Sequence, residues 1–458
     1  MLRTLNAQPT LWDALLPEMC LRLPAELEAV DRLLDDPVFF EPFRAQFHAT
    51  LGRPSIPIET YLRLMFLKYR YRLGFEPLCR EVADSISWQR FARIPLGVAV
   101  PHPTTLMKIT SRCGSEAVDG LNDALLAKAA AAKVLKTNKV RADTTVIEAN
   151  VAYPTDSGLL AKGVARMAKT IRRVKGAGLA SRTKTRDRTR TVHARARSIG
   201  ANLRRRTDEA KDEVRAINAD MVRVARRAVR EARAVVRNAR HALRQSGVVS
   251  GRTRAAVDEL ERTADRVERI AAQTSQRING STPDGATRLV SLHDPDARPI
   301  AKGRLGKPVE FGYKAQVADN EDGIVLDHNI EIGNPPDAPM LAPSIERIRR
   351  RAGRAPRAVT ADRGYGETAV EHTIEALGVT NVVLPTKGKP SAARRAHEQR
   401  RSFQHLVKWR TGIEGRISCL KRDFGWNRTR NDGIEGTRTW CGHGVFNHNL
   451  VKIAALIS

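Results

Sequence analysis

Three acidic residues, far apart in the sequence, have the side chains and settings that a metal-dependent reaction on nucleic acid requires. Asp143 lies in the segment 140–147 and Asp362 closes the run 358–362, so both are predicted on strands. Glu414 lies in a helical pattern. Carboxylates on separate elements can converge on hard divalent cations, which prefer oxygen ligands and promote phosphoryl transfer.

The charge of the chain indicates a polyanionic partner. Among 458 residues, with 41% hydrophobic, the formal net charge is +29. Positive charges in such excess repel one another, so a polyanionic partner is needed to compensate them, and nucleic acid is the expected one. An anionic membrane surface is the alternative, but the sequence has no amphipathic anchor, lipidation signal or apolar stretch of spanning length. The beginning lacks the apolar region of a signal peptide, and five scattered cysteines without a C-x-x-C pair argue against a disulfide scaffold.

Residues 1–135 are predicted to be helical, with prolines separating short helices. The strongest pattern runs over 58–73, where apolar residues recur at three and four positions and Arg63, Arg70 and Arg72 fall on the opposite face. A further helix start is expected at 104–108. Consecutive short helices of this kind fit either a DNA reader resembling a helix-turn-helix or a plain helical bundle.

The remaining pattern predicts a mixed α/β sheet that is interrupted after its first strand. The strand around Val140–Ile147 is followed by a long stretch without strand signals, until 309–317 alternates strictly between apolar and polar residues. The expected later elements are a turn at 320–323, a strand over 324–332, a helix from Pro339, a strand ending at Asp362, a helix over 368–377 and a strand over 379–384.

The interruption, residues 158–285, is strongly basic. Between 160 and 250 there are 26 lysines and arginines against 7 acids. Apolar residues at heptad spacing in 214–228 and 257–278 predict an antiparallel helical hairpin. The hairpin can contact DNA phosphates, or it can be a solvated coiled coil that contacts another protein or protomer.

Three further expectations concern this insertion. A turn is expected at 245–251, and the Arg/Thr-rich segment 184–197 is expected to be disordered when free. The candidates for phosphate contact are Arg223, Arg226, Arg227, Arg230 and Arg233.

The last predicted helix of the sheet domain would bring Glu414 to the sheet. Its apolar stripe comprises Leu406, Trp409, Ile413, Ile417 and Leu420. At about 100° per residue, Arg410, Glu414 and Lys421 fall within roughly 40° of each other, beside the stripe. Glu414 can then face the sheet edge while Arg410 and Lys421 face a phosphate.

These residues resemble the DDE transposases of bacterial insertion sequences, which have a ribonuclease-H-like core. The resemblance lies in 141–145 (RADTT), in 361–365 (ADRGY) and in the spacing Arg410-x3-Glu414-x6-Lys421. The family signature has a tyrosine where this chain has Val407. The segments 51–54 and 103–106 also resemble the N-terminal domain of many such enzymes, and 293–298 is similar to the segment before their second core strand.

The resemblance implies four regions: a helical DNA-binding domain at 1–135, the first strand of the catalytic domain at 136–157, the basic insertion at 158–285 and the rest of the catalytic domain at 286–458. Asp143, Asp362 and Glu414 would hold two Mg²⁺ ions, with Mn²⁺ as a substitute, about 4 Å apart. Asp294 and Asp296 are the nearest alternatives to Asp143.

The implied reaction is cleavage of the element's ends, followed by attack of the 3′-hydroxyl on target DNA. Arg410, Lys421 and Arg363 would contact DNA. The implied partner is double-stranded DNA, bound by a homodimer or higher oligomer in the bacterial cytoplasm, at the nucleoid. A nuclease without strand transfer and an inactive DNA-binding relic remain the alternatives.

Overall fold

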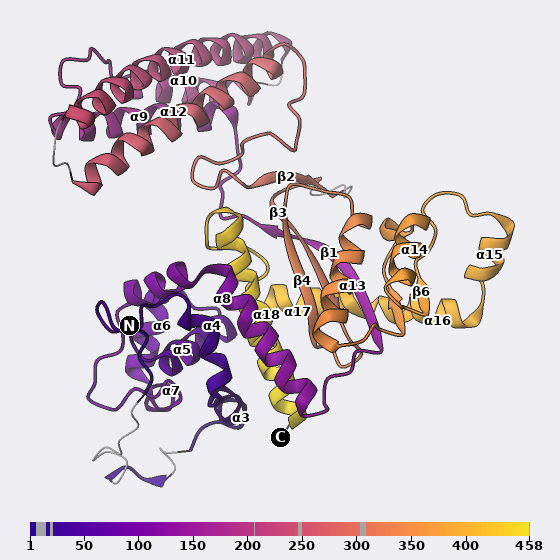
Figure 1. Cartoon of the computed structure of the whole chain (residues 1–458). Coiled ribbons are helices and arrows are strands. Elements are labelled where there is room, and N and C mark those ends of the chain that lie inside the picture. Colours follow the sequence, from indigo (N-terminus) through magenta and orange to yellow (C-terminus); the bar gives the residue numbers. More distant parts are fainter. Residues whose placement is uncertain (6–14, 19–21, 206, 246–249, 303–307, 458) are drawn as a thin grey trace. The chain divides into compact units, whose positions relative to one another are not determined.

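A computed structural model describes residues 1–5, 15–18, 22–205, 207–245, 250–302 and 308–457 (Figure 1). Its contacts divide the chain into two compact units. The first comprises 1–148, 313–331 and 335–458, and the second comprises 149–312 and 332–334. The predicted mixed α/β class is confirmed.

The first unit begins with helices. They are α3 (Ala25–Leu34), the 3₁₀ helix η1 (Pro37–Phe39), α4 (Glu41–Arg44), α5 (Ile58–Arg70), α6 (Phe75–Asp84), α7 (Ile86–Phe91) and α8 (Pro103–Ala131). The expected helix start at 104–108 is confirmed, because Pro103 occupies the first helical position and the ring of His102 accepts a hydrogen bond from the Thr104 amide. Helix α8 is interrupted at Gly114, whose φ of 63° is not helical.

Helix α5 is buried on both faces, including the face of Arg63 opposite the apolar residues. Arg63 has no exposed surface, and its guanidinium forms ion pairs with Asp31 at 2.6 Å and Asp35 at 2.7 Å. The periodicity identified the apolar stripe but could not reveal that the acids of α3 would cover the polar face. A buried arginine is stable here because two carboxylates compensate its charge.

The long helix α8 packs along the C-terminal helix α18 (Gly433–Ile457), so helices far apart in the sequence lie side by side within this unit (Figure 1). The Asn122 amide Nδ2 donates a hydrogen bond to the Gly442 carbonyl at 3.2 Å across this contact. Gly442 permits the close approach, because a Cβ there would lie 2.7 Å from a Val118 methyl group.

The strands form one mixed sheet. They are β1 (Lys139–Glu148), β2 (Arg298–Ala301), β3 (Val309–Asp319), β4 (Val325–Ile332), β5 (Ala358–Thr360) and β6 (Asn381–Val383). The order is β2–β3–β1–β5–β6, and β4 also pairs with β3. Strand β2 pairs antiparallel with the start of β3, whereas β1, β5 and β6 run parallel. All the predicted strands are confirmed within a few residues, and only β2 was missed.

Helices connect and follow these strands. They are α13 (Ala338–Ala352), the 3₁₀ helix η2 (Arg363–Tyr365), α14 (Thr368–Ala376), α15 (Ala392–Glu398), α16 (Arg401–Arg410) and α17 (Gly412–Asp423). The helix predicted to run continuously through Arg410 and Glu414 is divided at Thr411 into α16 and α17. The apolar stripe survives this division, since Leu406, Ile413 and Leu420 are all buried.

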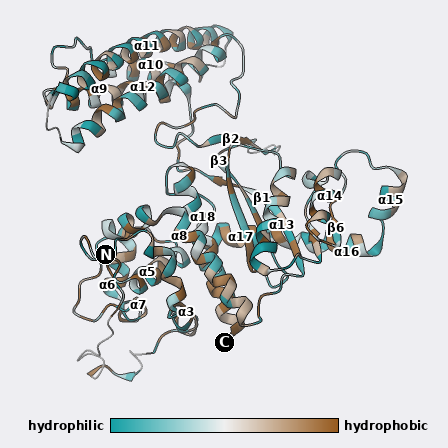
Figure 2. Ribbon diagram, in the orientation of Figure 1, coloured by the Kyte–Doolittle hydropathy of each residue, from teal (hydrophilic) through white to brown (hydrophobic). Residues whose placement is uncertain are grey.

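The second unit contains a bundle of four helices: α9 (Asp156–Gly176), α10 (Thr189–Asn202), α11 (Asp208–Gln245) and α12 (Gly251–Ile278). The predicted hairpin is α11 with α12, so it is only half of the structure. Its seam is confirmed, with Met221, Val224, Val257, Leu260, Ala264 and Val267 all buried. Figure 2 shows hydrophilic and hydrophobic residues alternating along these helices. Residues 246–249 of the expected turn lie outside the described residues.

Helix α10 corrects the expectation that 184–197 is disordered. It buries Val192 and Ile199 in the bundle core. The side chain of Arg188 pairs with Glu231 of α11 at 2.7 Å, and Arg195 pairs with Asp220 of the same helix. The composition suggested disorder because these arginines have few acidic residues near them in the sequence. The acids that pair with them, Glu231 and Asp220, lie on α11.

Candidate active site

Strands β1 and β5 bring Asp143 and Asp362 to the same end of the sheet. The strands are parallel, with Val140 opposite Val359 and Arg141 opposite Thr360. Asp143 follows Arg141 by two residues, and Asp362 follows Thr360 by two residues, so the two aspartates occupy equivalent positions beyond the paired segment. Asp362 follows the carboxyl end of β5, a place where chemistry often occurs in such sheets, and Asp143 lies within β1 at the neighbouring position.

The Asp143 carboxylate is largely buried, with 16% of its side chain exposed. Its Oδ1 accepts a hydrogen bond from the Thr144 amide at 2.7 Å, and its Oδ2 lies 3.2 Å from the Arg410 guanidinium. Burial raises the pKa of Asp143 to about 6, and the charges of Asp362 and Asp337 contribute in the same direction. The raised pKa means that nearby positive charge does not fully compensate this acid.

Asp337 is an additional acid at this end of the sheet, and the sequence reasoning missed it. It precedes α13, and its Oδ1 accepts a hydrogen bond from the Thr144 hydroxyl at 2.9 Å and pairs with the Lys314 ammonium at 2.6 Å. A Cβ at Gly364 would lie 3.0 Å from both Asp337 Oδ2 and Asp362 Oδ1. These two oxygens are therefore no farther apart than twice that distance. The feature of the sequence that could have identified Asp337 is its position just before the helix predicted from Pro339.

The buried Tyr365 provides a second indication that these acids converge. Its hydroxyl accepts a hydrogen bond from the Gln316 amide at 3.1 Å. Burial is the main cause that raises the pKa of Tyr365 well above its usual value, and the charges of Asp337, Asp143 and Asp362 raise it further. All three acids thus act on one phenol beneath the end of the sheet.

Glu414 reaches this region through Arg410. The Arg410 guanidinium lies 3.2 Å from Asp143 Oδ2 and 3.8 Å from Glu414 Oε1, so it bridges the two acids. The Glu414 side chain is 70% exposed, which leaves it open to solvent beside the buried Asp143. Glu414 lies in the first turn of α17, where the helix dipole favours a negative charge.

Arg141 fixes the start of α17 against β1. Its guanidinium donates a hydrogen bond to the Trp409 carbonyl at 2.9 Å and pairs with the buried Asp319 at 2.6 Å. A Cβ at Gly412 would lie 2.1 Å from the same guanidinium, so any larger residue there would displace it from Asp319 and the Trp409 carbonyl. The arginine of the RADTT segment therefore positions the helix that carries Glu414.

The donor set suits a divalent cation in its chemistry. A carboxylate whose pKa is raised mainly by burial and further by two neighbouring acids would be stabilised by a bound cation, and magnesium and manganese prefer carboxylate oxygens. In the described part of the chain, however, no group of three or more His, Cys, Asp or Glu side chains is close enough to form a metal-ligand set. Glu414 is held toward Arg410 instead.

The remaining residues predicted to contact DNA lie in different surroundings. Arg363 donates hydrogen bonds to the carbonyls of Thr386, at 2.9 Å, and Gly388, so it holds the loop after β6. Lys421 lies in the last turn of α17. Asp294 and Asp296, the alternatives to Asp143, belong to the second unit, where Asp294 Oδ1 accepts hydrogen bonds from the Asp296 and Ala297 amides.

The five candidate arginines of α11 divide into two groups. Arg226 and Arg233 pair with Glu268 at 3.3 Å and Asp265 at 3.0 Å on α12, and Arg223 pairs with Asp220 at 3.1 Å. Arg227 and Arg230 are exposed, and within the described residues neither has an ion pair or hydrogen bond.

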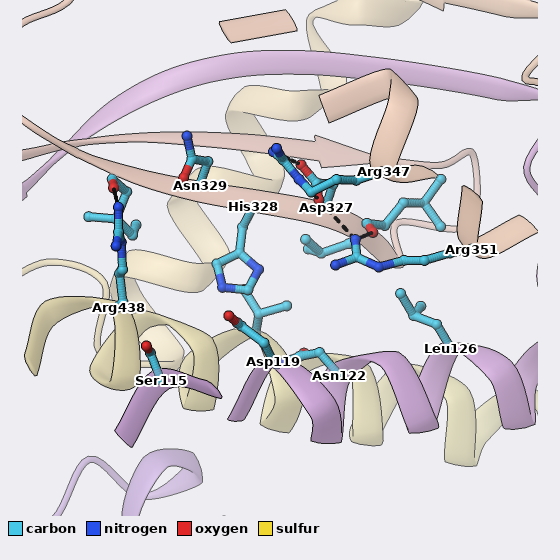
Figure 3. Close-up of a pocket in the computed structure, with 14 residues that line it drawn as sticks. Ser115, Asp119, Asn122, Leu126, Asp327, His328, Asn329, Arg347, Arg351 and Arg438 are labelled. Atoms are coloured by element: carbon cyan, nitrogen blue, oxygen red, sulfur yellow. Dashed lines mark hydrogen bonds and ion pairs between the residues drawn. The ribbon is translucent and has the colours of Figure 1, made fainter. Parts of the chain in front are cut away.

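A polar pocket joins α8 to β4 and α13 (Figure 3). Both oxygens of Asp327 are held by the guanidinium groups of Arg347 and Arg351, and Arg351 also pairs with Asp123 of α8 at 2.6 Å. Burial lowers the pKa of His328, whose ring faces Asp119 in the pocket. These pairs connect α8 to the sheet and α13.

Two family models match the chain. Residues 18–112 match a transposase domain (DUF772), and residues 281–450 match a transposase DDE domain. Neither the curated proteins nor the solved structures contain a match.

The chain belongs to the DDE transposases of insertion-sequence type. The family consists in general of nuclease or transferase enzymes that bind DNA and typically use divalent metal ions. Among the described helices, none is both long and apolar enough to cross a membrane.

Proposed function

We propose that this chain cleaves DNA strands at the ends of its element and joins the resulting 3′-hydroxyl groups to target DNA. The main support is the equivalent position of Asp143 and Asp362 beyond paired β1 and β5. The sheet order also supports a ribonuclease-H-like core, because β4, β3, β1, β5 and β6 follow one another across it and β1, β5 and β6 are parallel.

Asp143, Asp362 and Glu414 are the residues that would hold two Mg²⁺ or Mn²⁺ ions. When bound, such ions activate the attacking oxygen and stabilise the leaving oxygen of a phosphoryl transfer. Asp337 is less suited to the same role, because the Lys314 ammonium and the Thr144 hydroxyl already occupy its Oδ1. Its pairing with Lys314 makes it a positioning residue that holds Thr144 beside Asp143.

Arg410 would exchange partners during the reaction. Without DNA its guanidinium bridges Asp143 and Glu414. When Asp143 and Glu414 hold cations, the Arg410 guanidinium would be free to hold the phosphate that is being attacked. Lys421, farther along α17, and Arg363, beside Asp362, would contact the DNA backbone outside the reacting phosphate.

The regions would divide the work as follows. The helices within 1–135 would bind the element's ends, 136–157 and 286–458 would form the catalytic domain, and the basic insertion at 158–285 would hold flanking DNA. In the insertion, the outward Arg227 and Arg230 are better candidates for phosphate contact than Arg223, Arg226 and Arg233, whose charges are partly compensated by neighbouring acids. Two ends would be brought together by a homodimer or higher oligomer in the bacterial cytoplasm.

The test uses purified protein and a supercoiled plasmid that carries the gene with its natural flanking DNA. With Mg²⁺, we expect nicks at the two ends of the element and joined products in a second, target plasmid. Nicks without joined products would indicate a nuclease. Binding to the flanking DNA without nicks, in Mg²⁺ and in Mn²⁺, would indicate an inactive DNA-binding protein and contradict the proposal.

A further inference from the structure

Lys68 is a buried lysine without an acidic partner. Its residue is 2% exposed, in the last turn of α5. The ammonium lies 4.2 Å from the ring centre of Trp440, 4.3 Å from that of Tyr69 and 4.8 Å from that of Phe75. Among the described residues it has no hydrogen-bond acceptor or carboxylate partner. Lysine is rarely buried in this way, because removal from water is unfavourable for an unpaired charge.

The same lysine lines a cavity of about 450 Å³ that contains an excess of positive charge. Arg72, Arg428 and Arg430 also line it, whereas the one acid in the lining, Glu148, already pairs with Arg428 at 2.8 Å. The Arg430 guanidinium has no ion pair or hydrogen bond within the described residues. Burial, and then the charge of Arg430, lower the pKa of Lys68 to about 7. The positive charges that line the cavity therefore outnumber its one carboxylate.

The backbone at Arg72 is a second, independent observation. Arg72 has a φ of 57°, in the left-handed region that favours glycine. It lies just after α5, where the Leu73 amide closes the helix by donating to the Lys68 carbonyl at 2.9 Å. An arginine side chain is thus retained at a strained position, where it donates a hydrogen bond to the Arg422 carbonyl at 2.8 Å. Strain that persists in this way often marks a functional position.

We propose that this cavity binds a backbone phosphate of DNA, which Lys68, Arg72 and Arg430 would contact together. Two guanidinium groups supply paired donors for phosphate oxygens, and the ammonium adds a point charge. The ring of Trp440 shields Lys68 from water, which strengthens the attraction. The DNA source of the phosphate rests on the proposed function, whereas the preference for a phosphate rests on the cavity alone.

The site would connect DNA to the catalytic helix. The cavity lies between the end of α5, the segment 424–432 that links α17 to α18, and Trp440 of α18. Helix α17 carries Glu414 in its first turn and ends at Asp423, shortly before this segment. A phosphate bound here would hold the N-terminal helices and the end of α17 on one DNA strand, away from the reacting phosphate.

The test measures binding of the full chain to a short labelled DNA duplex by fluorescence anisotropy, in EDTA, over a range of salt concentrations. Lys68→Met keeps the apolar contact with the three rings and removes the charge. We expect about tenfold weaker binding, the effect of losing one charged hydrogen bond. The slope of log affinity against log salt should fall by about 0.9. Lys133→Met, at an exposed lysine of the same unit, should leave both quantities unchanged.

Two more variants separate binding from folding. Arg430→Gln changes an exposed side chain and should lower the affinity and the salt slope as Lys68→Met does. Arg72→Gly should raise the melting temperature, since glycine relieves the backbone strain, and should nevertheless weaken DNA binding. A variant that is more stable but binds less tightly cannot be explained by misfolding.

A second measurement identifies the source of the phosphate. Thermal melting in sodium phosphate is compared with melting in sodium chloride at equal ionic strength, for the wild type and for Lys68→Met. Unchanged DNA affinity and slope in both Lys68→Met and Arg430→Gln would overturn the DNA proposal. Stabilisation by inorganic phosphate that Lys68→Met abolishes would then assign the cavity to free phosphate, and no stabilisation would show that it binds neither. A wild-type protein that bound no DNA would contradict the proposed function instead, and the phosphate arm would still decide the cavity's ligand.

Discussion

The end of the sheet around Asp143 and the surface of α11 handle concentrated charge in opposite ways. At the sheet, Asp143, Asp362 and Asp337 converge, and the pKa of Asp143 is raised because burial and its neighbours disfavour its charge. On α11, the arginines that face α12 have acidic partners, whereas the exposed Arg227, Arg230 and Arg237 have none among the described residues. Crowded charge suits the capture of a small, highly charged ion, and spread charge suits a long polyanion such as DNA.

The largest expected effect concerns the acids at the sheet. Asp143→Asn and Asp362→Asn should each reduce Mg²⁺-dependent nicking of the plasmid by roughly a thousandfold or more, since an amide lacks the charge that holds the metal. Binding of flanking DNA, measured in EDTA, should remain close to wild type.

Asp337→Asn is the matched control, because it removes an acid from the same cluster that is already paired with Lys314. This variant should lose no more than the roughly 10–100-fold that is usual for residues that orient a metal ligand. If Asp337→Asn were as inactive as Asp143→Asn, the division of roles among the three acids would be wrong.

The second effect concerns the two sides of α11. Arg227, Arg230 and Arg237 are exposed and have no partners among the described residues, so replacing all three by Gln should lower the salt slope of DNA binding by about 0.9 for each phosphate that is no longer bound. Arg226, Arg233 and Arg240 pair with Glu268, Asp265 and Glu261 on α12.

The matched triple replacement of Arg226, Arg233 and Arg240 by Gln should change the salt slope little. It should lower the melting temperature slightly, because exposed ion pairs contribute only about 0.2–1 kcal/mol each. Equal salt slopes for the two triple variants would show that the outward face of α11 does not contact DNA more than the face toward α12. An unchanged slope in the outward variant would favour the alternative in which the bundle contacts another protomer.

The smallest effect is on stability and follows from the pKa of Asp143. Its folded-state pKa, about 6, lies above the ordinary value of 3.8, so the folded chain binds a proton more tightly than the unfolded chain. The resulting stabilisation is present below about pH 4 and is lost as the pH rises through about 6. Asp143→Asn should therefore stabilise the first unit at pH 8, by as much as about 3 kcal/mol.

The check is thermal melting in EDTA at two pH values, near 8 and near 4. The stabilising effect of Asp143→Asn should vanish at the lower pH, because the wild-type carboxyl is then protonated and is as uncharged as the amide. A variant that is less stable than the wild type at pH 8 would mean that the pair with Arg410 outweighs the burial of Asp143.

The sequence predicts features that depend on neighbouring residues, and it does not predict those that depend on contacts between residues far apart in the chain. Asp143 and Asp362 could be identified because Asp143 lies within a recognisable strand and Asp362 closes another, and parallel pairing then places them together. Asp337 could not, because its role depends on the distant side chains of Thr144 and Lys314. The sequence also could not show that a helix predicted as continuous would be divided at Thr411.

The insertion shows the same limit. The heptad pattern correctly placed the α11–α12 seam, because apolar spacing within each helix determines it. Whether Arg226 or Arg227 is available to DNA depends instead on which acid of α12 lies opposite, and the hydrophobic pattern does not reveal this. Helix α10 was missed for the related reason that its stabilising acids, Asp220 and Glu231, belong to α11.

The most direct test of the central claim is a change of metal preference at Asp143. Asp143→Cys replaces a carboxylate with a thiolate, which Mn²⁺ accepts more readily than Mg²⁺ does. Nicking of the plasmid by Asp143→Cys should be nearly abolished in Mg²⁺ and should recover by at least about tenfold in Mn²⁺, while Asp143→Asn should stay inactive in both. Equal nicking by Asp143→Cys in the two metals would contradict the assignment of Asp143 as a metal ligand.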